Sequence, residues 1–405
     1  MIDFEFEPAL IERLKLLRTV AERMMRPISR EYDEREHEKP WQFFETMWSA
    51  SHTADLERDA GGTAAKSTSN GRNLYTIATT EELAWGDVGL FLSIPNPGLG
   101  GAAVMAAGTA DQKDRFLAPF RAGKPKWAAM AITEPECGSD SAAISTAARR
   151  DGDEWVINGA KIFCTSGQMA LEKSEGFVVV WATVDKSAGR AGIKPFVIPH
   201  GTPGATVVRV ENKLGIRASD TAAILFENCR VPLDHILGTP DISREHGFKD
   251  VMATFDVTRP IVAAMAIGVG RAALEFVRDF LSEHKIAIRY GASPYRLTAV
   301  ERDFMEMEVQ LKAARLLTWR AAWMLDRGKH NSLEASMAKA KAGLAVTQIT
   351  QKAVEMLGPA GYSRKFLLEK WMRDAKINDI FEGTQQINML IVARRILGYT
   401  SKELN

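Results

Sequence analysis

The sequence predicts an α+β protein in which an N-terminal α-helical domain, a central antiparallel β domain and a C-terminal four-helix bundle follow one another. Apolar residues recur at helical spacing near the start of the chain, at Leu10, Leu14 and Leu17. Short runs rich in β-branched and aromatic residues fill the middle, and long amphipathic stretches follow them. We therefore expect domains at residues 1–123, 124–240 and 241–405.

The N-terminal domain is expected to be helical, with one break at residues 94–98. Pro95 and Pro97 lie there, and each removes a backbone donor and clashes with the preceding helical turn. A helix that begins near Thr79 must therefore stop or unwind at this point. The glycines at positions 98, 100 and 101 make an irregular path easier still.

The β domain is expected to hold short strands, and the last domain long helices. Asp151-Gly152, shortly before Trp155, is typical of a tight hairpin turn. Gly268 and Gly270 fit part of a dinucleotide fingerprint, but they lie inside a helical run, where small residues favour close helix packing instead. The expected strands cover 127–132, 155–157, 177–184, 195–198, 206–210 and 223–226, and the expected helices cover 256–281, 298–325 and 333–357.

Composition excludes several classes of protein. Lys plus Arg number 52 against 51 acidic residues, a balance that argues against nucleic-acid binding. Cys137, Cys164 and Cys229 are far apart and predict reduced thiols in a cytoplasmic location, and neither they nor the histidines have the spacing of metal ligands. The acidic N-terminus and the shortness of the apolar run at 261–270 predict no signal peptide and no membrane insertion.

The candidate catalytic residue is Glu382, which stands between an apolar pair and a glycine in Ile380-Phe381-Glu382-Gly383-Thr384. Apolar neighbours keep water away from a carboxylate, which raises its pKa and makes it a stronger base near neutral pH. The glycine lets the backbone pass close to a ligand. Taken alone, a glutamate before a glycine is more often a solvated helix end.

Five stretches, in order along nearly the whole chain, resemble the acyl-CoA dehydrogenase family. Removing one hydrogen from the carbon beside a thioester carbonyl, and another from the next carbon, needs a base and a hydride acceptor. Because no side chain accepts a hydride, a cofactor is required, and the resemblance implies FAD. The stretches are AITEPECGSD at 131–140, INGAKIFCTSG at 157–167, KLGIRASDT at 213–221, GPAGY at 358–362 with RDAKI at 373–377, and IFEGTQQI at 380–387.

The resemblance makes Glu382 the base that takes the proton from the acyl-CoA substrate. Some family members carry the base on the helix equivalent to residues 255–260, but this chain has Thr258 there, which cannot act as a base. The family also uses the backbone N–H of the glutamate to stabilise the thioester oxygen. The resemblance further implies electron-transfer flavoprotein as electron acceptor. The apolar faces of the long helices between Asp256 and Leu357 suit packing between bundles and predict a homo-oligomer, a tetramer built from dimers.

Flavin and substrate contacts carry over from the family's motifs. Phe163 stands where the family often has Trp against the flavin face. Isolated apolar strand residues such as Phe163 and Ile132 are usually core, but the surrounding motifs favour flavin contacts for both. Arg259 could instead be an ordinary surface ion-pair partner. The cofactor candidates are Ile132, Thr133, Ser139, Phe163, Thr165, Tyr290, Glu355, Gly358, Thr384 and Gln386, and the substrate candidates are Phe91, Ser139, Asp256, Arg259 and Gly383.

The chain departs from the family pattern on the adenine side of the FAD site. Residues 284–291 contain an apparent insertion, after which Tyr290-Gly291 replaces Phe-Gly, and Glu355 stands where the family usually has Gln. These changes leave open a catalytically reduced subunit within a mixed assembly. The fold is also compatible with a flavin-dependent monooxygenase and with a non-catalytic flavin-bearing protein. The intact Glu-Gly-Thr motif argues against the monooxygenase, and the balanced charge argues against the non-catalytic protein.

The helix break at residues 94–98 also bears on which type of acyl group the protein would accept. In the resembled family the helix that contains Phe91 lines the floor of the acyl pocket. Unwinding at 94–98 should widen that floor, and Phe91 and Leu92 make it apolar, which predicts a bulky, branched or cyclic acyl group. The opposite possibility is that Phe91 plugs the space and leaves a short pocket.

Overall fold

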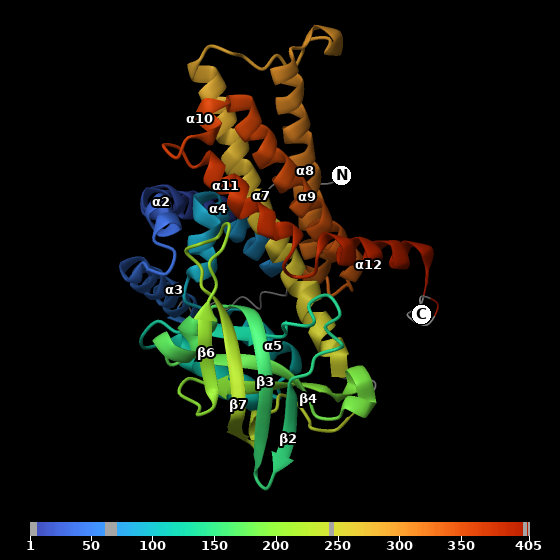
Figure 1. Ribbon diagram of the computed structural model, residues 1–405. Helices are drawn as coiled ribbons and strands as arrows, with labels where there is room; N and C mark the ends of the chain where they lie inside the picture. Colours follow the sequence, from blue (N-terminus) through green and yellow to red (C-terminus); the bar gives the residue numbers. More distant parts are fainter. Residues whose placement is uncertain (1–5, 61–70, 243–246, 400–402, 404–405) are drawn as a thin grey trace.

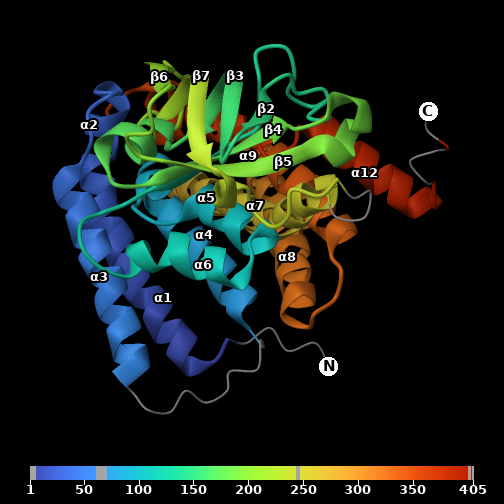
Figure 2. The ribbon, with the colours of Figure 1, turned by 90° about the horizontal axis from the view of Figure 1, so that it is seen from below.

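The computed structural model describes residues 6–60, 71–242, 247–399 and 403. Figure 1 shows the β domain at one end of a set of long helices, with the N-terminal helices along one side. Seen from below, α4, α5 and α6 lie beneath the sheet (Figure 2). The N-terminal elements are α1 (Pro8–Val20), η1 (Ala21–Met25), α2 (Arg26–Glu34), α3 (Trp41–Ala60), α4 (Arg72–Ser93), α5 (Gly98–Ala107), α6 (Ala110–Leu117) and η2 (Ala118–Arg121).

The break expected at the two prolines is confirmed. Helix α4 ends at Ser93, α5 begins at Gly98, and the two helices are bent by 80° across the gap. The Asn96 side chain holds the turn, because its Nδ2 donates to the Ile94 carbonyl and its Oδ1 accepts from the Gly98 N–H, each at 2.6 Å. Trp127 Nε1 donates to the Ser93 carbonyl, which the helix end would otherwise leave unpaired.

The irregular path is shorter than the glycines suggested, and α4 begins at Arg72, ahead of the expected start. Gly100 and Gly101 lie inside α5, where Gly100 allows close packing rather than unwinding. A Cβ atom at Gly100 would lie 2.7 Å from the Ala129 carbonyl oxygen of strand β1. Gly100 therefore lets α5 pack directly on the sheet.

A second interruption in α4, at Asp87, has no signal in the sequence. The Asp87 backbone is extended, and its Oδ1 accepts from the Leu90 N–H at 2.8 Å, which caps the second half of the helix. Its Oδ2 accepts from Lys370 Nζ at 2.7 Å, and Lys370 also donates to Asp374 at 2.6 Å. This buried ion cluster fixes α4 against α11 (Leu368–Ala375).

The β domain is one seven-stranded sheet with the order β1-β4-β2-β3-β7-β6 and β5 paired to β4. Pairs β1–β4 and β2–β4 are parallel and the others are antiparallel. The hairpin at Gly152 is confirmed, with Asp151 paired to Glu154. The strands are β1 (Ala128–Ala131), β2 (Ala147–Asp151), β3 (Glu154–Thr165), β4 (Phe177–Thr183), β5 (Ile193–Pro199), β6 (Ala205–Val210) and β7 (Thr221–Pro232).

Strand β2 was not expected from the sequence. Three of its five residues are charged: Arg149 and Arg150 are exposed, and Asp151 is partly buried. The strand therefore lacks the apolar run by which strands are recognised in a sequence. Backbone pairing with β3 makes this segment a strand, although its composition does not favour one.

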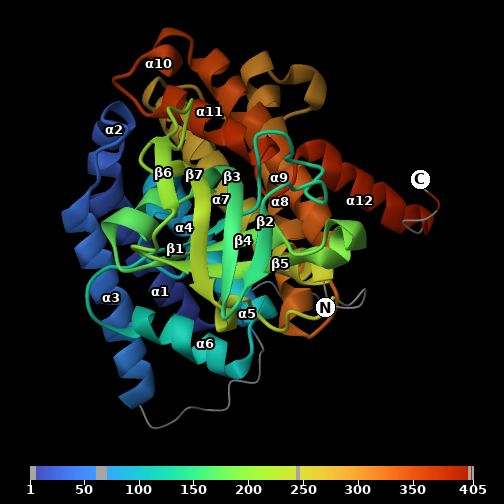
Figure 3. The same ribbon diagram turned by 60° about the horizontal axis from the view of Figure 1, so that its bottom comes forward.

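Three long helices form most of the C-terminal bundle: α7 (Gly247–Glu283), α8 (Ala299–Asp326) and α9 (Ser332–Leu357). Thr298 and Glu301 form a capping box that begins α8 where the sequence predicts it. The chain then returns through α10 (Pro359–Tyr362), α11 and η7 (Lys376–Asp379) to α12 (Gln385–Leu397), which points away from the body in Figures 1 and 3.

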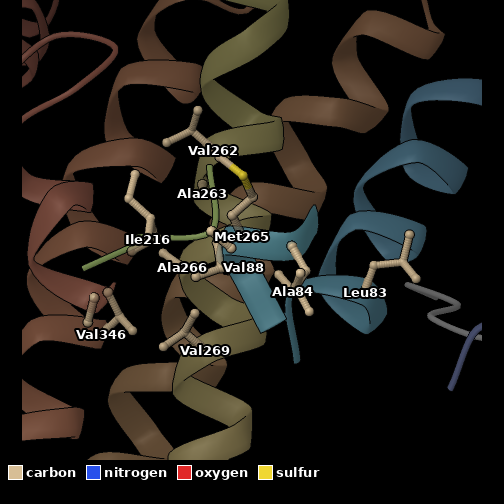
Figure 4. Close-up of a cluster of buried hydrophobic side chains, with 14 of the residues drawn as sticks. Leu83, Ala84, Val88, Ile216, Val262, Ala263, Met265, Ala266, Val269 and Val346 are labelled. Atoms are coloured by element: carbon tan, nitrogen blue, oxygen red, sulfur yellow. The ribbon is translucent and has the colours of Figure 1, made fainter. Parts of the chain in front are cut away.

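Helix α7 is the centre of the core. Figure 4 shows side chains of α7, among them Met265 and Ala266, beside Val88 of α4, Val346 of α9 and Ile216 from the segment between β6 and β7. By length and composition, the α7 segment Thr254–Glu283 would suffice to cross a membrane, which the shorter apolar run at 261–270 would not. However, 78% of its most apolar window is buried inside the fold, as is usual for a central core helix.

The glycines of the fingerprint-like sequence lie inside α7, so the interpretation as a packing site is confirmed. A Cβ atom at Gly268 would lie 2.5 Å from the Glu81 carbonyl oxygen of α4. The helices meet at a distance that only glycine permits.

Gly268→Ala is therefore expected to destabilise the protein by about 1–3 kcal/mol, because the methyl group must push two core helices apart. The measurement is the midpoint of thermal unfolding followed by circular dichroism. Gly291→Ala is the matched control, since a Cβ there meets no atom within 4 Å. Equal midpoints for the two variants would contradict the close-packing explanation.

Candidate active site

Glu382 lies in a left-handed turn between η7 and α12. Its φ is +56° and that of Gly383 is +87°, and a positive φ is unfavourable for glutamate. The turn leads into α12, which Thr384 caps by accepting a hydrogen bond from the Ile387 N–H at 3.2 Å. Surrounding contacts must therefore hold Glu382 in a conformation that its own backbone disfavours.

Two buried donors converge on the carbonyl that follows Glu382. Lys339 Nζ of α9 donates to the Gly383 oxygen at 2.6 Å, and Asn388 Nδ2 of α12 donates to the same oxygen at 2.8 Å. Neither residue was expected from the sequence, because a lysine or asparagine within a helix carries no signal of a partner distant in the chain.

The Glu382 carboxylate faces α7. Thr258 Oγ1 donates to Glu382 Oε2 at 2.8 Å, so the two positions at which the family carries its base are adjacent in this protein. Desolvation by the packed atoms raises the pKa of Glu382, although the residue remains partly exposed. The Thr258 hydrogen bond and the charges of Arg259 and Lys339 oppose this shift without cancelling it.

A proline shapes α7 directly below these residues. Pro260 cannot donate to the carbonyl of Asp256, four residues earlier. Asn331 Nδ2 donates to that carbonyl instead, at 3.2 Å. A side chain from the residue before α9 thus replaces the backbone donor that the proline lacks, close to Thr258 in α7.

Arg259 is a buried cation beside the turn. It is 3% exposed, and its Nη1 lies 3.4 Å from Ser336 Oγ and 3.5 Å from Asp256 Oδ1. Burial lowers the pKa of Arg259 and raises that of Asp256. Arg259 is therefore not a surface ion-pair partner but part of the wall around Glu382.

On the β domain, a buried ion pair aligns the predicted flavin residues. Lys161 Nζ of β3 donates to Glu134 Oε1 at 2.7 Å and to the Ile132 carbonyl at 3.0 Å. The Ile162 N–H donates to the Thr133 carbonyl at 2.9 Å. Ile132 and Thr133, which follow β1, are thus held beside the end of β3 that carries Phe163 and Thr165.

Glu134 accepts further hydrogen bonds from the N–H groups of Ser145 and Thr146 and from the Ser145 hydroxyl, at 2.6–2.9 Å. Although its burial opposes ionisation, the charge of Lys161 and these hydrogen bonds lower the pKa of Glu134 to about 2. The loop that contains Ser139 starts from this anchor, and Ser139 itself is exposed.

Phe163 is an exposed aromatic side chain on a distorted strand. It is 59% exposed, its φ is +57°, and it lies in a register shift between β3 and β7. The interpretation of Phe163 as strand core is therefore wrong, while Ile132 is only partly buried. An aromatic ring turned outward at the cost of backbone strain suits a flat partner.

The remaining candidates lie in three places. Phe91 is partly buried near the end of α4, and Thr384 and Gln386 border a hollow at the start of α12. Tyr290 and Glu355 are exposed at the far end of the bundle. The hollow is lined by Leu344, Lys376, Asp379, Ile380, Thr384, Gln385 and Gln386.

The far-end candidates are not brought to Glu382 within one subunit. Tyr290 follows α7, whose end at Glu283 is about 36 Å from Arg259 by the rise of a helix. Glu355 pairs with Lys352 at 3.0 Å and precedes Gly358 at the end of α9, close to α10 in Figure 1. Within one subunit, these residues are therefore remote from the Glu382 carboxylate.

Among the described residues, no group of three or more His, Cys, Asp or Glu side chains is arranged to hold a metal ion. The three cysteines are buried and unpaired, and burial raises the pKa of Cys164 and of Cys229. Neither thiol has the low pKa of a reactive cysteine.

Comparison with known proteins decides the family. Models of the acyl-CoA dehydrogenase N-terminal, middle and C-terminal domains match residues 12–124, 129–229 and 245–397. The chain belongs to the acyl-CoA dehydrogenase family. It is thus an FAD-dependent oxidoreductase of the class that acts on CH–CH bonds of acyl-CoA, and the predicted fold class is confirmed.

Several relatives are similar over most of their length. The mitochondrial short-chain specific acyl-CoA dehydrogenase of Bos taurus is 41% identical over 80% of this chain and 75% of that protein. The short-chain specific enzyme of Clostridium acetobutylicum is 33% identical, over 94% and 96% of the two chains.

Solved structures share the fold. Butyryl-CoA dehydrogenase from Megasphaera elsdenii is 31% identical, with a TM-score of 0.84 over 98% of this chain and all of that one. A chain in a structure described as the electron transferring flavoprotein of Acidaminococcus fermentans is 30% identical, with a TM-score of 0.81 and the same coverage.

The residues present fit the family's FAD. The outward-facing ring of Phe163 and the partly exposed Ile132 and Thr133 offer a flat apolar surface with polar edges. The hollow at the start of α12 adds hydroxyl and amide groups from Thr384, Gln385 and Gln386, which suit a polar portion of the cofactor.

Lys161→Met is expected to destabilise this acyl-CoA dehydrogenase by about 3–5 kcal/mol, because it leaves the Glu134 carboxylate buried without its cation. The stabilisation from Glu134 is fully present above its unfolded pKa of 4.5 and is lost as pH falls towards the folded value of about 2. Thermal midpoints measured between pH 7 and pH 3 test this.

The control is the double variant Glu134→Gln with Lys161→Met, which removes both charges and should recover part of the loss. A single variant as stable as wild type, or a double variant less stable than Lys161→Met, would contradict the role of the pair.

Proposed function

We propose that this chain oxidises an acyl-CoA thioester to the trans-2-enoyl-CoA, with Glu382 as the base that removes the proton next to the carbonyl. The observation that carries the proposal is the strained turn that directs the Glu382 carboxylate at Thr258 while burial raises its pKa. A raised pKa brings the carboxylate closer to the operating pH, where a base is most effective. FAD, when bound, supplies the hydride acceptor.

The chain's own residues would orient the thioester. The backbone N–H of Glu382 is proposed to donate to the thioester oxygen, where negative charge develops as the proton leaves. Arg259 and Asp256 form the wall of α7 beside the turn, and with Gly383 and Ser139 they would contact the coenzyme A arm. The buried Arg259 cation also favours the ionised form of Glu382.

Flavin contacts are proposed from two sides. Ile132, Thr133, Phe163 and Thr165 of the β domain would lie along the ring. Thr384 and Gln386 would hold the pyrophosphate or adenosine portion. Tyr290 lies far from Glu382 along α7, and Glu355 and Gly358 lie at the end of α9. As the resemblance to the family implies, we assign these residues to the FAD of a neighbouring subunit.

The proposed electron acceptor is an electron-transfer flavoprotein. The support is the similarity to a chain in the Acidaminococcus fermentans structure. A cytoplasmic location stays a prediction, because the similar proteins include mitochondrial and bacterial members.

Glu382→Gln should keep bound, yellow FAD and lose at least about 10²–10⁴-fold in the rate of flavin reduction, the usual contribution of a positioned base. The measurement is anaerobic bleaching of the flavin by acyl-CoA in a stopped-flow instrument. Glu227→Gln, an exposed carboxylate of β7, is the matched control. Near-normal reduction in Glu382→Gln would refute the assignment. Bleaching without oxygen also separates a dehydrogenase from a monooxygenase.

We propose a homotetramer. The support is the set of exposed apolar side chains on the projecting helix α12, namely Met389, Leu390, Ile396 and Leu397. Exposed apolar surface of this kind is typical of an interface. The proposed contact of Tyr290, Glu355 and Gly358 with a neighbouring subunit's FAD fits this assembly.

Light scattering of the wild type should therefore give the mass of four chains, and Leu390→Glu with Ile396→Glu should lower it. Val208→Glu, on an exposed apolar residue of β6, is the control that should leave the mass unchanged. An active, FAD-loaded monomer would refute the assembly.

The acyl group is proposed to be bulky, branched or cyclic. The support is the 80° bend between α4 and α5 next to the partly buried Phe91 and Leu92, where the backbone leaves the helical path. The names of the short-chain relatives favour a short pocket instead.

Turnover of butyryl-, octanoyl-, isobutyryl- and cyclohexanecarbonyl-CoA decides between the two pockets. The wide pocket predicts higher kcat/KM for the branched and cyclic thioesters than for butyryl-CoA. A clear preference for butyryl-CoA would rule the wide pocket out.

A further inference from the structure

Lys339 is a buried cation that donates a hydrogen bond to the turn after Glu382. It lies on α9, is 1% exposed, and donates from Nζ to the Gly383 carbonyl at 2.6 Å. Moving an ammonium group out of water costs on the order of several kcal/mol unless charges and hydrogen bonds compensate. A residue kept at such a cost needs a reason beyond filling space.

Satisfying the Gly383 carbonyl does not require a charge. Asn388 Nδ2 already donates to the same carbonyl at 2.8 Å, and it also donates to the Thr384 carbonyl at 3.0 Å. Neutral amide donors thus hold one side of the turn. The positive charge of Lys339 must be explained by what surrounds it.

The charged groups around Lys339 come from two other elements. Glu382 and Asp379 lie on the segment that leads into α12, and both raise the pKa of Lys339, whereas Arg259 of α7 lowers it. Burial dominates, so the pKa of Lys339 falls to about 8. Lys339 therefore remains charged at neutral pH, and its charge in turn lowers the pKa of Glu382.

We propose that Lys339 is a positioning residue for catalysis: it anchors the Gly383 carbonyl so that the left-handed turn presents Glu382, and its charge keeps the Glu382 carboxylate ionised. The inference rests on the proposed role of Glu382 as the base. Lys339 itself touches neither substrate nor cofactor in this assignment.

Two consequences follow for Glu382. Without the cation, the Glu382 carboxylate should bind its proton more tightly, because an opposite charge nearby favours the ionised form. Without the hydrogen bond, a glutamate at φ +56° has one anchor fewer and the turn should open more often.

The experiment compares Lys339→Met with the wild-type holoenzyme. The rate of anaerobic flavin reduction by the fastest thioester of the panel is measured from about pH 5 to about pH 9, a range that brackets a raised carboxylate pKa. The acidic limb of the profile, which is the pH range over which the rate falls as Glu382 gains a proton, should move to higher pH by about one unit. Amide hydrogen exchange of the peptide that contains residues 380–388 should become faster.

Lys341→Met is the matched control. It makes the same substitution two residues along α9, where the lysine bonds to Gln310 of α8 instead of the turn. Its acidic limb and its exchange at 380–388 should match the wild type.

Lys339→Arg is a second variant, which tests the role of the charge even if Lys339→Met fails to fold. Because arginine keeps both charge and donors, the acidic limb should stay within about 0.3 pH units of wild type, a twofold change in the protonation equilibrium. An arginine variant with a limb shifted by a full unit would contradict the proposal, as would a methionine variant whose limb and exchange rates do not change.

Failure of this inference is distinguishable from failure of the proposed function. If Glu382→Gln still reduces flavin, Glu382 is not the base, whatever Lys339 does. If Glu382→Gln abolishes reduction and the Lys339 variants keep the wild-type pH profile, only the role of Lys339 is refuted.

Discussion

The active site depends on one constraint, the left-handed turn at Glu382 and Gly383. A glutamate does not adopt this backbone by preference, so the turn exists only because packed elements hold it. Thr258 of α7 binds the carboxylate, and Lys339 of α9 and Asn388 of α12 bind the next carbonyl. Any motion among these three helices would therefore reach the proposed base directly.

The same pattern holds on the β domain. A buried pair between Lys161 and Glu134 connects β3 to the segment after β1, and it leaves Phe163 turned outward at a register shift. A second buried cluster around Lys370 fixes the kink of α4 at Asp87. In both places a paired charge lies where the backbone departs from regular structure, and at the end of β3 this irregular backbone carries the candidate residue Phe163.

These buried charges explain why the chain carries costly interactions in its core. Replacing a buried ion pair by apolar residues often leaves stability unchanged or improves it, so stability is a weak reason to keep one. Here the pairs hold irregular backbone that apolar packing alone would not specify. The central helix α7 shows the opposite case, since its glycine contact with α4 and its apolar faces set the helix spacing by shape.

The sequence by itself determined the family, the fold class, the long helices, most strands, the hairpin at Gly152 and the break at Pro95 and Pro97. Each of these rests on local chemistry: periodic apolar residues, turn residues, or a proline that cannot donate. The sequence also singled out Glu382, through a motif contiguous in the chain. Strand β2 was not predicted, because its charged residues carry no strand signal and only the pairing with β3 makes them a strand.

Only the tertiary structure decided what surrounds the motif. Thr258, Lys339 and Glu382 are separated by 43 residues or more of chain, and no pattern in any of the three segments shows that their side chains meet. Likewise the outward turn of Phe163 follows from a register shift between two strands, not from the residues of one strand. Local chemistry fixes which elements form, whereas the pKa of a base depends on charges and burial that arise only when those elements pack.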